Sequence, residues 1–234
     1  MPKPEPSQTP HVVALLLRRG LGVLNFVMAF AVAIALAVNI SDRLIQGIFN
    51  PTHYFQYFTI QTSVINIVVL LIGGIFGVMR KNDPHWYSTM RASIVSYAIV
   101  TGVIYNLLLA GFPATDGYVA SFSFPGDMQH IWAPLFIAVE WLLMPGRTRL
   151  RWGVLWISAV YPLVWVVGSL IRGLVGDGWF PYFFLNVTDM GIAGVVAYIA
   201  AIAAFVVGNA AIAVAVGRFH SRVFVGFRLD RTGI

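Results

Sequence analysis

Residues 53–77 read HYFQYFTIQTSVINIVVLLIGGIFG, and this stretch decides the fold class of the chain. Its second half is continuously apolar, whereas its first half carries four polar residues at positions i, i+3, i+4 and i+7. Residues with this spacing share one face of an α-helix. The stretch therefore predicts an apolar helix with a polar stripe at one end, formed by Thr59, Thr62, Ser63 and Asn66.

The composition of the whole chain is that of a membrane protein. Of its 234 residues 59% are hydrophobic and 10% are charged, whereas soluble domains carry about 25% charged residues. A helix needs about 20 apolar residues to cross a bilayer, and helices satisfy their backbone polar groups within lipid. We therefore expect an all-α polytopic membrane protein, a bundle of six transmembrane helices at about 20–40, 58–79, 91–111, 128–145, 152–172 and 190–216.

Lysine and arginine residues predict the orientation of this bundle, because they concentrate in cytoplasmic loops. Thirteen of the 15 basic residues flank the expected helices on one side, and only Arg43 and Arg172 lie on the other. Both termini are thus expected in the cytoplasm of a multi-pass cell-membrane protein. We expect residues 1–10 to be a disordered tail, 11–220 the helical bundle and 221–234 a cytoplasmic tail.

Several classes of site are excluded by the sequence. The chain has no cysteine, so disulfides, thiolate catalysis and cysteine-held metals are ruled out. It lacks the G-x-S-x-G and H-E-x-x-H motifs, a glycine-rich phosphate loop and a basic-aromatic nucleic-acid surface. We expect no metal, no cofactor and no nucleic-acid partner, and the sequence leaves the oligomeric state open. Small residues predict close packing within the chain, namely Gly73 and Gly77 in the second run and Gly191, Gly194, Ala197, Ala201 and Ala204 in the sixth.

Polar residues gather near the end of the bundle that is expected to face outward. With the predicted orientation, the stripe of the second run, His130 of the fourth run, Asn106 of the third and Asn186 before the sixth all lie toward that surface. This pattern predicts a cavity open to the outer leaflet or the outer water. For Thr62 and Ser63, hydrogen bonds back to the i−4 carbonyl are an alternative interpretation.

Glu140 is an ionisable group inside the fourth run, and such groups within a membrane are functional candidates by default. It lies ten residues after His130, about 15 Å further along the helix and on a different face. We expect it near the middle of the bilayer, either protonated or hydrogen-bonded to Tyr161 or Tyr105. Two interpretations are open: it forms structural hydrogen bonds between helices, or it takes part in substrate binding or proton transfer.

A hydroxyl and an imidazole at the same depth on two helices fit a nucleophile and its general base. Thr59 and His130 are each expected near a helix N-terminus, where the positive end of the helix dipole keeps an imidazole neutral. Unpaired N–H groups at these ends also suit the oxyanion formed when an ester carbonyl is attacked. We therefore expect a threonine-type carboxylic ester hydrolase with Thr59 and His130 as catalytic residues.

Three segments strengthen this expectation through a resemblance. The stretches YFTIQTSVIN (57–66), HIWAPLFIAVEW (130–141) and GWFPYFF (178–184) resemble the family of androgen-induced and androgen-dependent transmembrane hydrolases, which cleave fatty acid esters of hydroxy fatty acids. The resemblance implies a multi-helix membrane fold, Thr59 as nucleophile, His130 as its partner, and a membrane lipid or lipid ester as substrate. The late aromatic cluster of the family maps onto Trp179 and Tyr182. The spacing from His130 to Pro134 and the order of Pro181 and Tyr182 depart from the family pattern.

Two other functions fit the same sequence. A lipid or small-solute transporter would use the outward-facing polar cavity and Glu140, although the chain lacks obvious inverted repeats. A helical bundle that only binds other membrane proteins is the third interpretation. In the hydrolase and transporter interpretations, the residues expected to line the cavity are Thr62, Ser63, Asn66, Asn106, Glu140, Trp179, Tyr182 and Asn186.

Overall fold

The computed structural model describes residues 9–223, and within that range all regular structure is helical. Two π-helical segments, η1 (Tyr105–Leu109) and η2 (Met128–Trp132), continue α4 and join α5 to α6, and a 3-10 turn, η3 (Phe183–Leu185), precedes α8. The expected all-α class is confirmed for these residues. The α-helices are α1 (Thr9–Ile45), α2 (Pro51–Tyr54), α3 (Phe58–Met79), α4 (His85–Ile104), α5 (Phe124–Asp127), α6 (Ala133–Leu143), α7 (Val154–Val175) and α8 (Val187–Val223).

Five helical stretches in the described part are long and apolar enough to cross a membrane. They coincide with five of the expected runs and extend several of them at their ends. The remaining run, 128–145, corresponds to α5, η2 and α6, which together occupy residues 124–143. None of these three elements alone reaches the length of a crossing, so the count of six stays a prediction. The five stretches are Val12–Ile45, Phe58–Met79, His85–Leu109, Val154–Val175 and Val187–Phe219.

The tails predicted for residues 1–10 and 221–234 lie largely outside the described residues. Residues 9 and 10 already belong to α1, and residues 221–223 belong to α8. Helix α8 also contains a break that the sequence pattern did not predict, because Gly191 has a φ of 65° and a ψ of 163°. Only glycine adopts such a conformation without strain.

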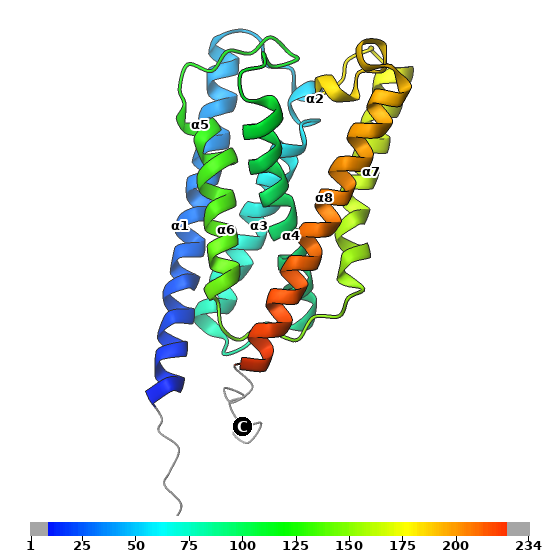
Figure 1. The fold of residues 1–234 in the computed structure, drawn as a ribbon. Coiled ribbons are helices and arrows are strands. Elements are labelled where there is room, and N and C mark those ends of the chain that lie inside the picture. Colours follow the sequence, from blue (N-terminus) through cyan, green and yellow to red (C-terminus); the bar gives the residue numbers. More distant parts are fainter. Residues whose placement is uncertain (1–8, 224–234) are drawn as a thin grey trace, which may run out of the picture.

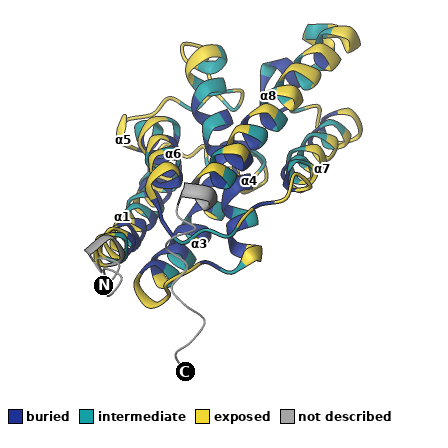
Figure 2. Ribbon diagram, turned by 60° about the horizontal axis from the view of Figure 1, so that its bottom comes forward, coloured by how far each residue is buried: buried dark blue, intermediate teal, exposed yellow. Residues whose placement is uncertain are grey.

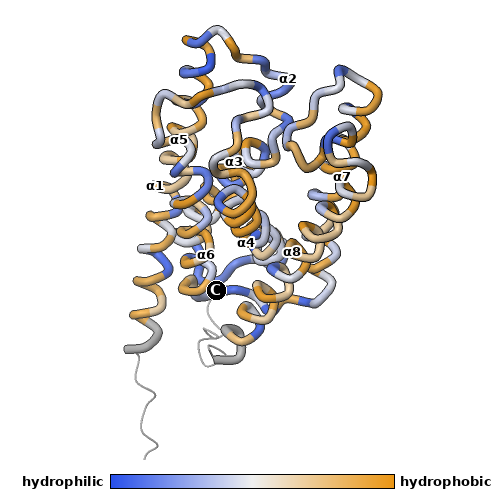
Figure 3. Tube along the Cα trace, turned by 45° about the horizontal axis from the view of Figure 1, so that its top comes forward, coloured by the Kyte–Doolittle hydropathy of each residue, from blue (hydrophilic) through white to orange (hydrophobic). Residues whose placement is uncertain are grey.

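Helix α4 forms the centre of the molecule. It packs against α3 and α6 on one side and against α7 and α8 on the other, and α1 lies outside α3 and α6 (Figure 1). Most of its residues are buried, whereas α7 and α8 expose much of their length (Figure 2). The exposed side chains of α7 and α8 are mainly apolar, as expected for surfaces that face lipid (Figure 3).

Glycine allows α1 and α3 to touch. A Cβ atom on Gly77 would lie 2.7 Å from the Cα of Gly22, and one on Gly74 would lie 2.7 Å from the ring of Phe26. Gly73 faces Asn25 of α1 and the hydroxyl of Tyr87. The expectation that the glycines of this run serve packing within the chain is therefore confirmed.

The corresponding expectation for α8 is wrong. Ala197, Ala201 and Ala204 are exposed, and a Cβ atom on Gly191 would meet no atom within 4 Å. On α8, Val206 contacts α4 through its carbonyl oxygen, which accepts from the hydroxyl of Ser96, and the buried residues Ala210 and Val214 lie one and two turns further along. The small residues recur along the helix as the sequence shows, but they lie on its outward side.

The two ends of the bundle differ in charge. Helix α1 begins and α8 ends at the same end, where the loops 80–84 and 144–153 also lie (Figure 1). We call this the basic end, because most arginine and lysine side chains of the described residues lie there. The opposite end carries α2 and the loops 110–123 and 176–186.

Candidate functional site

The polar stripe of α3 faces the interior of the bundle. Thr59, Thr62, Ser63 and Asn66 are 9%, 2%, 3% and 6% exposed, respectively. The hydroxyl of Thr62 donates to the carbonyl of Phe58 at 2.9 Å, so the i−4 interpretation holds for this residue. Asn66 Oδ1 has no hydrogen-bond partner among the described residues. The stripe is thus buried inside the protein and not turned toward lipid.

Thr59 lies at the start of α3. Tyr57 precedes the helix in an extended conformation, and Phe58 and Thr59 are its first two residues. The N–H groups of Phe58 and Thr59 have no carbonyl partner within the helix, whereas that of Ile60 donates to the carbonyl of Tyr57 at 3.1 Å. The expectation that Thr59 lies at a helix N-terminus is confirmed.

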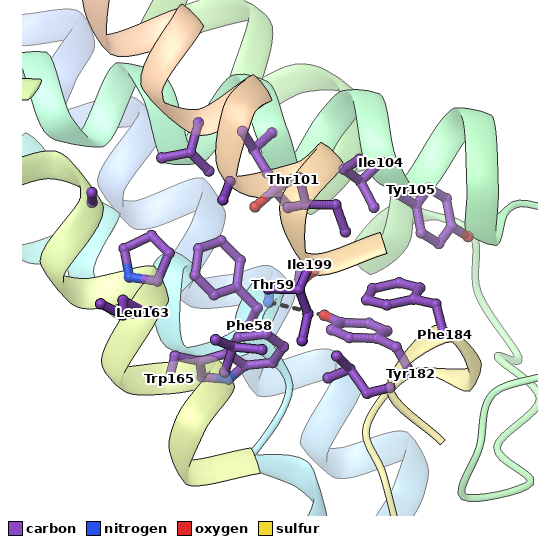
Figure 4. A pocket seen from close by; sticks show the side chains of 18 of the residues that line it. Phe58, Thr59, Thr101, Ile104, Tyr105, Leu163, Trp165, Tyr182, Phe184 and Ile199 are labelled. Carbon is purple, nitrogen blue, oxygen red and sulfur yellow. Dashed lines mark hydrogen bonds between the residues drawn. The ribbon is translucent and has the colours of Figure 1, made fainter. Parts of the chain in front are cut away.

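A cavity of about 180 Å³ adjoins Thr59 between α3, α4, α7 and α8, and the segment before α8 closes it (Figure 4). Its wall is almost entirely apolar. The lining residues that carry a hydroxyl group are Thr59, Thr101, Tyr105 and Tyr182. A cavity with this lining suits a hydrocarbon chain that has one polar group near Thr59. Its apolar wall includes Phe58, Ile104, Leu163, Trp165, Phe184 and Ile199.

Tyr182 is the polar neighbour of Thr59. Its hydroxyl accepts a hydrogen bond from the backbone N–H of Thr59 at 3.4 Å, and Figure 4 shows it pointing toward that residue. Burial raises the pKa of Tyr182, and hydrogen bonds with the side chain and backbone of Thr59 and with the backbone of Phe58 partly offset this effect. The phenol therefore stays protonated at neutral pH.

His130 lies in η2 and is partly buried. Its Nδ1 lies 2.9 Å from the carbonyl oxygen of Gly126. A carbonyl oxygen only accepts hydrogen bonds, so in the neutral ring Nδ1 carries the proton and Nε2 is the basic atom. The imidazole also stacks on the ring of Tyr105, with centroids 3.5 Å apart and an interplanar angle of 11°.

Tyr105 connects the two candidate residues. It lines the cavity together with Thr59, and its ring stacks on the imidazole of His130. No hydrogen bond joins Thr59 to His130 directly among the described residues. The bundle does bring the two residues to the same region, because α4 touches the α3 stripe through Thr101 and the η2 backbone through Gly102.

Both sides of the Tyr105–His130 stack are π-helical. Tyr105 begins η1 and His130 is the central residue of η2. A π-helical turn inserts an extra residue and so turns side chains to directions that an α-helix does not offer, and such turns are frequent at functional sites. Two of them in contact form the most irregular part of the helical core.

The expectation that His130 lies near a helix N-terminus is wrong. The helix begins at Phe124, with Pro125 in its first turn, so His130 lies more than one turn inside it. Asp127 lies within the helix and does not cap it. The first-turn N–H groups that can face a ligand in this region are therefore those of α3, next to Thr59.

Glu140 does not belong to this site. It lies in the last turn of α6 and forms an ion pair with Arg91, and it accepts a hydrogen bond from Asn25 Nδ2 at 3.2 Å. The expectation that it forms a hydrogen bond with Tyr161 or Tyr105 is wrong, because its partners are Arg91 of α4 and Asn25 of α1. Asp83 continues the network by pairing with both Arg91 and Arg18. Glu140 thus lies near the basic end and does not line the cavity.

The other predicted residues have structural partners. Asn106 Nδ2 donates to the carbonyls of Gly102 at 2.8 Å and of His130 at 3.3 Å, so it ties η1 to η2. Asn186 Oδ1 accepts from the N–H of Thr188 at 3.0 Å and thereby caps the start of α8. Neither residue lines the cavity.

Trp179 closes the loops at this end. It stacks on His53 with centroids 4.1 Å apart, and its indole N–H donates to the carbonyl of Thr115 at 3.3 Å. Asp177 bonds His53 at 3.0 Å and Arg172 at 2.8 Å. These contacts join α2 to the loops 110–123 and 176–186. We call the set His53, Thr115, Arg172, Asp177 and Trp179 the loop clamp.

Sequence reasoning missed Tyr105, Thr101 and the ion network. Tyr105 and Thr101 are four residues apart on one face of α4, and this spacing was the available signal. Arg91 is one of the 13 basic residues that the charge pattern counts as flanking the helices, although it is 4% exposed within α4. Among the residues that the structure describes, no cluster of three metal-ligating side chains is found.

Comparison of the chain with protein-family models, curated proteins and solved structures gives no match.

Proposed function

We propose that the protein is a membrane-embedded lipid ester hydrolase in which Thr59 is the nucleophile and His130 the general base. One observation carries this proposal. Thr59 is a buried helix-terminal hydroxyl in the wall of an apolar cavity, and Tyr105 of the same wall holds the imidazole of His130. The proposed nucleophile thus lies in the wall of the proposed acyl pocket, and the proposed base, which does not itself line the pocket, stacks on another residue of that wall.

The reaction would proceed in two halves. Thr59 Oγ1 attacks the ester carbonyl carbon while His130 Nε2 takes the hydroxyl proton, directly or through one water. The tetrahedral oxyanion collapses, the bond to the leaving oxygen breaks, and His130 returns the proton to the departing alcohol. Water then attacks the acyl-threonine with His130 as base, which releases the carboxylic acid and restores the Thr59 hydroxyl.

The substrate class follows from the cavity wall. Its residues are almost all apolar, so it favours a hydrocarbon chain over a polar head group. The fatty acid esters of hydroxy fatty acids cleaved by the family that the sequence resembles have this character. A membrane lipid ester of similar shape is the substrate we propose.

The orientation is part of the same proposal. The basic end would face the cytoplasm, with both termini there, and the cavity end would face the outer leaflet of the cell membrane. Six crossings, with α5, η2 and α6 acting together as one, would give this arrangement. The substrate would then reach Thr59 from the outer half of the bilayer.

Hydrolysis of a branched fatty acid ester by the purified protein tests this function. Thr59→Ala and His130→Ala should each lower kcat/KM by at least about 10³-fold, because nucleophile and base act as a unit. Thr59→Ser keeps a hydroxyl and should retain activity. The matched controls Thr188→Ala and His85→Ala change exposed residues that do not line the cavity and should have no effect. Full activity in either of the first two variants would refute the assignment.

The transporter alternative has lost its main residue, because Glu140 is ion-paired near the basic end. It predicts Glu140-dependent flux in proteoliposomes and no covalent labelling of Thr59 by a fluorophosphonate. That pair of results would replace the hydrolase proposal.

A further inference from the structure

Tyr182 is held more firmly than a cavity lining requires. Its ring stacks on Phe184, with centroids 5.2 Å apart and an interplanar angle of 12°. The rings of Tyr57 and Trp165 approach it at 5.7 Å and 5.8 Å. The residue is 9% exposed. Three aromatic neighbours thus fix the ring, and the position of its hydroxyl is fixed with it.

The hydroxyl lies where the helix α3 begins. The N–H of Thr59 donates to it over 3.4 Å, which is longer than a typical N–H···O hydrogen bond. A bond of this length is exchanged for a better acceptor at little cost. Since the phenol oxygen accepts from Thr59, its own hydrogen is available to an acceptor that lies beside the Thr59 hydroxyl.

Other donors in the cavity wall are committed or turned away. The indole N–H of Trp165 donates to the carbonyl of Gln56 at 2.9 Å. The hydroxyl of Thr101 lies 3.5 Å from that of Thr62. In Figure 4 the hydroxyl of Tyr105 points away from Thr59, whereas that of Tyr182 points toward it. Tyr182 and the first-turn N–H of Thr59 are the donors that converge beside the nucleophile.

We propose that Tyr182 is a catalytic residue whose phenol, together with the backbone N–H of Thr59, forms the oxyanion hole of the reaction. This inference rests on the proposed hydrolase function. When Thr59 attacks, the carbonyl oxygen becomes negatively charged and moves between the two donors, and the phenol O–H turns from its resting contact to this oxygen. The phenol donates a hydrogen bond to this oxygen without giving up its proton, while His130 takes the proton of the Thr59 hydroxyl.

The apolar surroundings make this arrangement effective. A hydrogen bond to a developing charge stabilises it more when the site excludes water and the donor is already oriented. Because burial keeps the Tyr182 phenol protonated, the donor is present throughout the neutral pH range. Removal of one such donor typically lowers kcat by about 10²–10³-fold.

The test compares Tyr182→Phe with the wild type on one ester substrate. We expect kcat to fall about 10²–10³-fold with KM changed less than about threefold, because the ring and the cavity wall stay in place. Tyr198→Phe is the matched control. It removes a phenol from another ring that stacks on Phe184 but does not line the cavity, and it should leave kcat unchanged. An unchanged kcat in Tyr182→Phe, or a rise in KM alone, would overturn the role of Tyr182.

A second measurement covers the case in which Tyr182→Phe does not fold. Replacement of Tyr182 by 3,5-difluorotyrosine keeps the ring and the hydroxyl but makes the phenol more acidic. The variant should keep kcat within about tenfold at neutral pH, and its activity should decline at a lower alkaline pH than that of the wild type. An unshifted alkaline limb would exclude the phenol as a donor to the reacting atoms.

The failure of this inference is distinguishable from failure of the proposed function. An inactive Thr59→Ala variant beside a fully active Tyr182→Phe variant overturns only the oxyanion role. A fully active Thr59→Ala variant overturns both. Intact-mass measurement of the fluorophosphonate adduct adds a direct reading, since Tyr182→Phe should slow the labelling of Thr59 without moving it to another residue.

Discussion

Glu140 illustrates what a buried charge needs in this protein. Its side chain is 4% exposed, and it is compensated by Arg91 and by the amide of Asn25. Asp83 and Arg18 extend the network, and both are also buried. Charges in such surroundings are tolerated only when each has partners, because desolvation is expensive. The network joins α1, α4, α6 and the 80–84 loop at the basic end.

Loss of one member should therefore be costly. Among the described residues, Glu140→Ala leaves Asp83 as the one carboxylate paired with Arg91, and we expect the free energy of unfolding to fall by about 3–5 kcal/mol. Thermal unfolding in detergent measures the effect, and Asp189→Ala, at an exposed carboxylate, is the control. If Glu140→Ala were as stable as the wild type, the network would be dispensable for folding.

A single methyl group tests the contact between α1 and α3. Gly77→Ala places a Cβ atom 2.7 Å from the backbone of Gly22, so the two helices must separate. We expect destabilisation of about 1–3 kcal/mol, as for other overpacked cores. Gly20→Ala has open space and should be neutral or slightly stabilising, because alanine favours helix. Equal melting temperatures for the two variants would contradict the close contact, and a detergent melting curve suffices to decide.

At the scale of elements, the site depends on irregular pieces of helix. The two π-helical segments η1 and η2 bring Tyr105 and His130 face to face, and the loop clamp holds the segment that carries Tyr182. Helices place most of the core, but the candidate site lies where the helices begin, change pitch or stop. This distribution agrees with the tendency of functional residues to occupy connections on a rigid scaffold.

The loop clamp should open in acid. The hydrogen bond from His53 is the largest cause that lowers the pKa of Asp177, from its ordinary 3.8 to about 2, with the N–H of Trp179 as a further donor. A carboxylate with a lowered pKa stabilises the folded state above its unfolded pKa, and this contribution is lost as the pH falls through the folded value. The clamp should therefore hold above pH 3.8 and weaken between about pH 4 and pH 2.

Pepsin digestion at pH 4, 3 and 2 measures this opening, with rates normalised to an unfolded peptide of residues 172–186. Cleavage within 176–182 should rise steeply in the wild type as the pH falls. Asp177→Asn lacks the titrating group and should be cut readily at every pH. A pH-independent wild type would show that Asp177 does not control the clamp.

At the scale of the whole molecule, the absence of cysteine makes the orientation easy to test. Single cysteines at the exposed positions Lys81, Ala120 and Arg149 report three successive loops. In intact cells a membrane-impermeant maleimide should label Ala120→Cys, whereas Lys81→Cys and Arg149→Cys should react only after lysis. Labelling of Arg149→Cys from outside would mean that α5, η2 and α6 do not cross the membrane.

Much of the fold was predictable because lipid imposes simple rules. Apolar run length identified the five helices that are long and apolar enough to span a membrane, and the run 58–79 coincides with α3. The i, i+3, i+4, i+7 spacing correctly placed the Thr59 stripe on a buried face. These features depend on the hydropathy and the spacing of neighbouring residues, and both can be obtained from one sequence.

The rest depends on contacts between distant segments. Nothing local indicates that Arg91 would be buried against Glu140, or that the small residues of α8 face outward. The π-helical turns likewise arise where η1 packs on η2, and the break at Gly191 has no counterpart in the apolar pattern. At the site, the sequence predicted only that Thr59 and His130 lie at the same depth. The role of Tyr105, which lines the cavity and stacks on His130, depends on the packing of η1 on η2.

The position of the cavity has a consequence for selectivity. One wall belongs to α3 and α4, which the arginine–carboxylate network and the glycine contacts fasten to α1 and α6. The other wall belongs to α7 and α8, which meet the remaining helices mainly through α4, and α7 carries Pro162 at the level of the cavity. One wall of the pocket is thus braced by ion pairs, whereas the other is held by apolar packing and hydrogen bonds and includes a proline-containing helix, so we expect the second wall to adjust more readily. We therefore expect the protein to accept hydrocarbon chains of varied width and length, and to be selective mainly for the ester bond that lies beside Thr59.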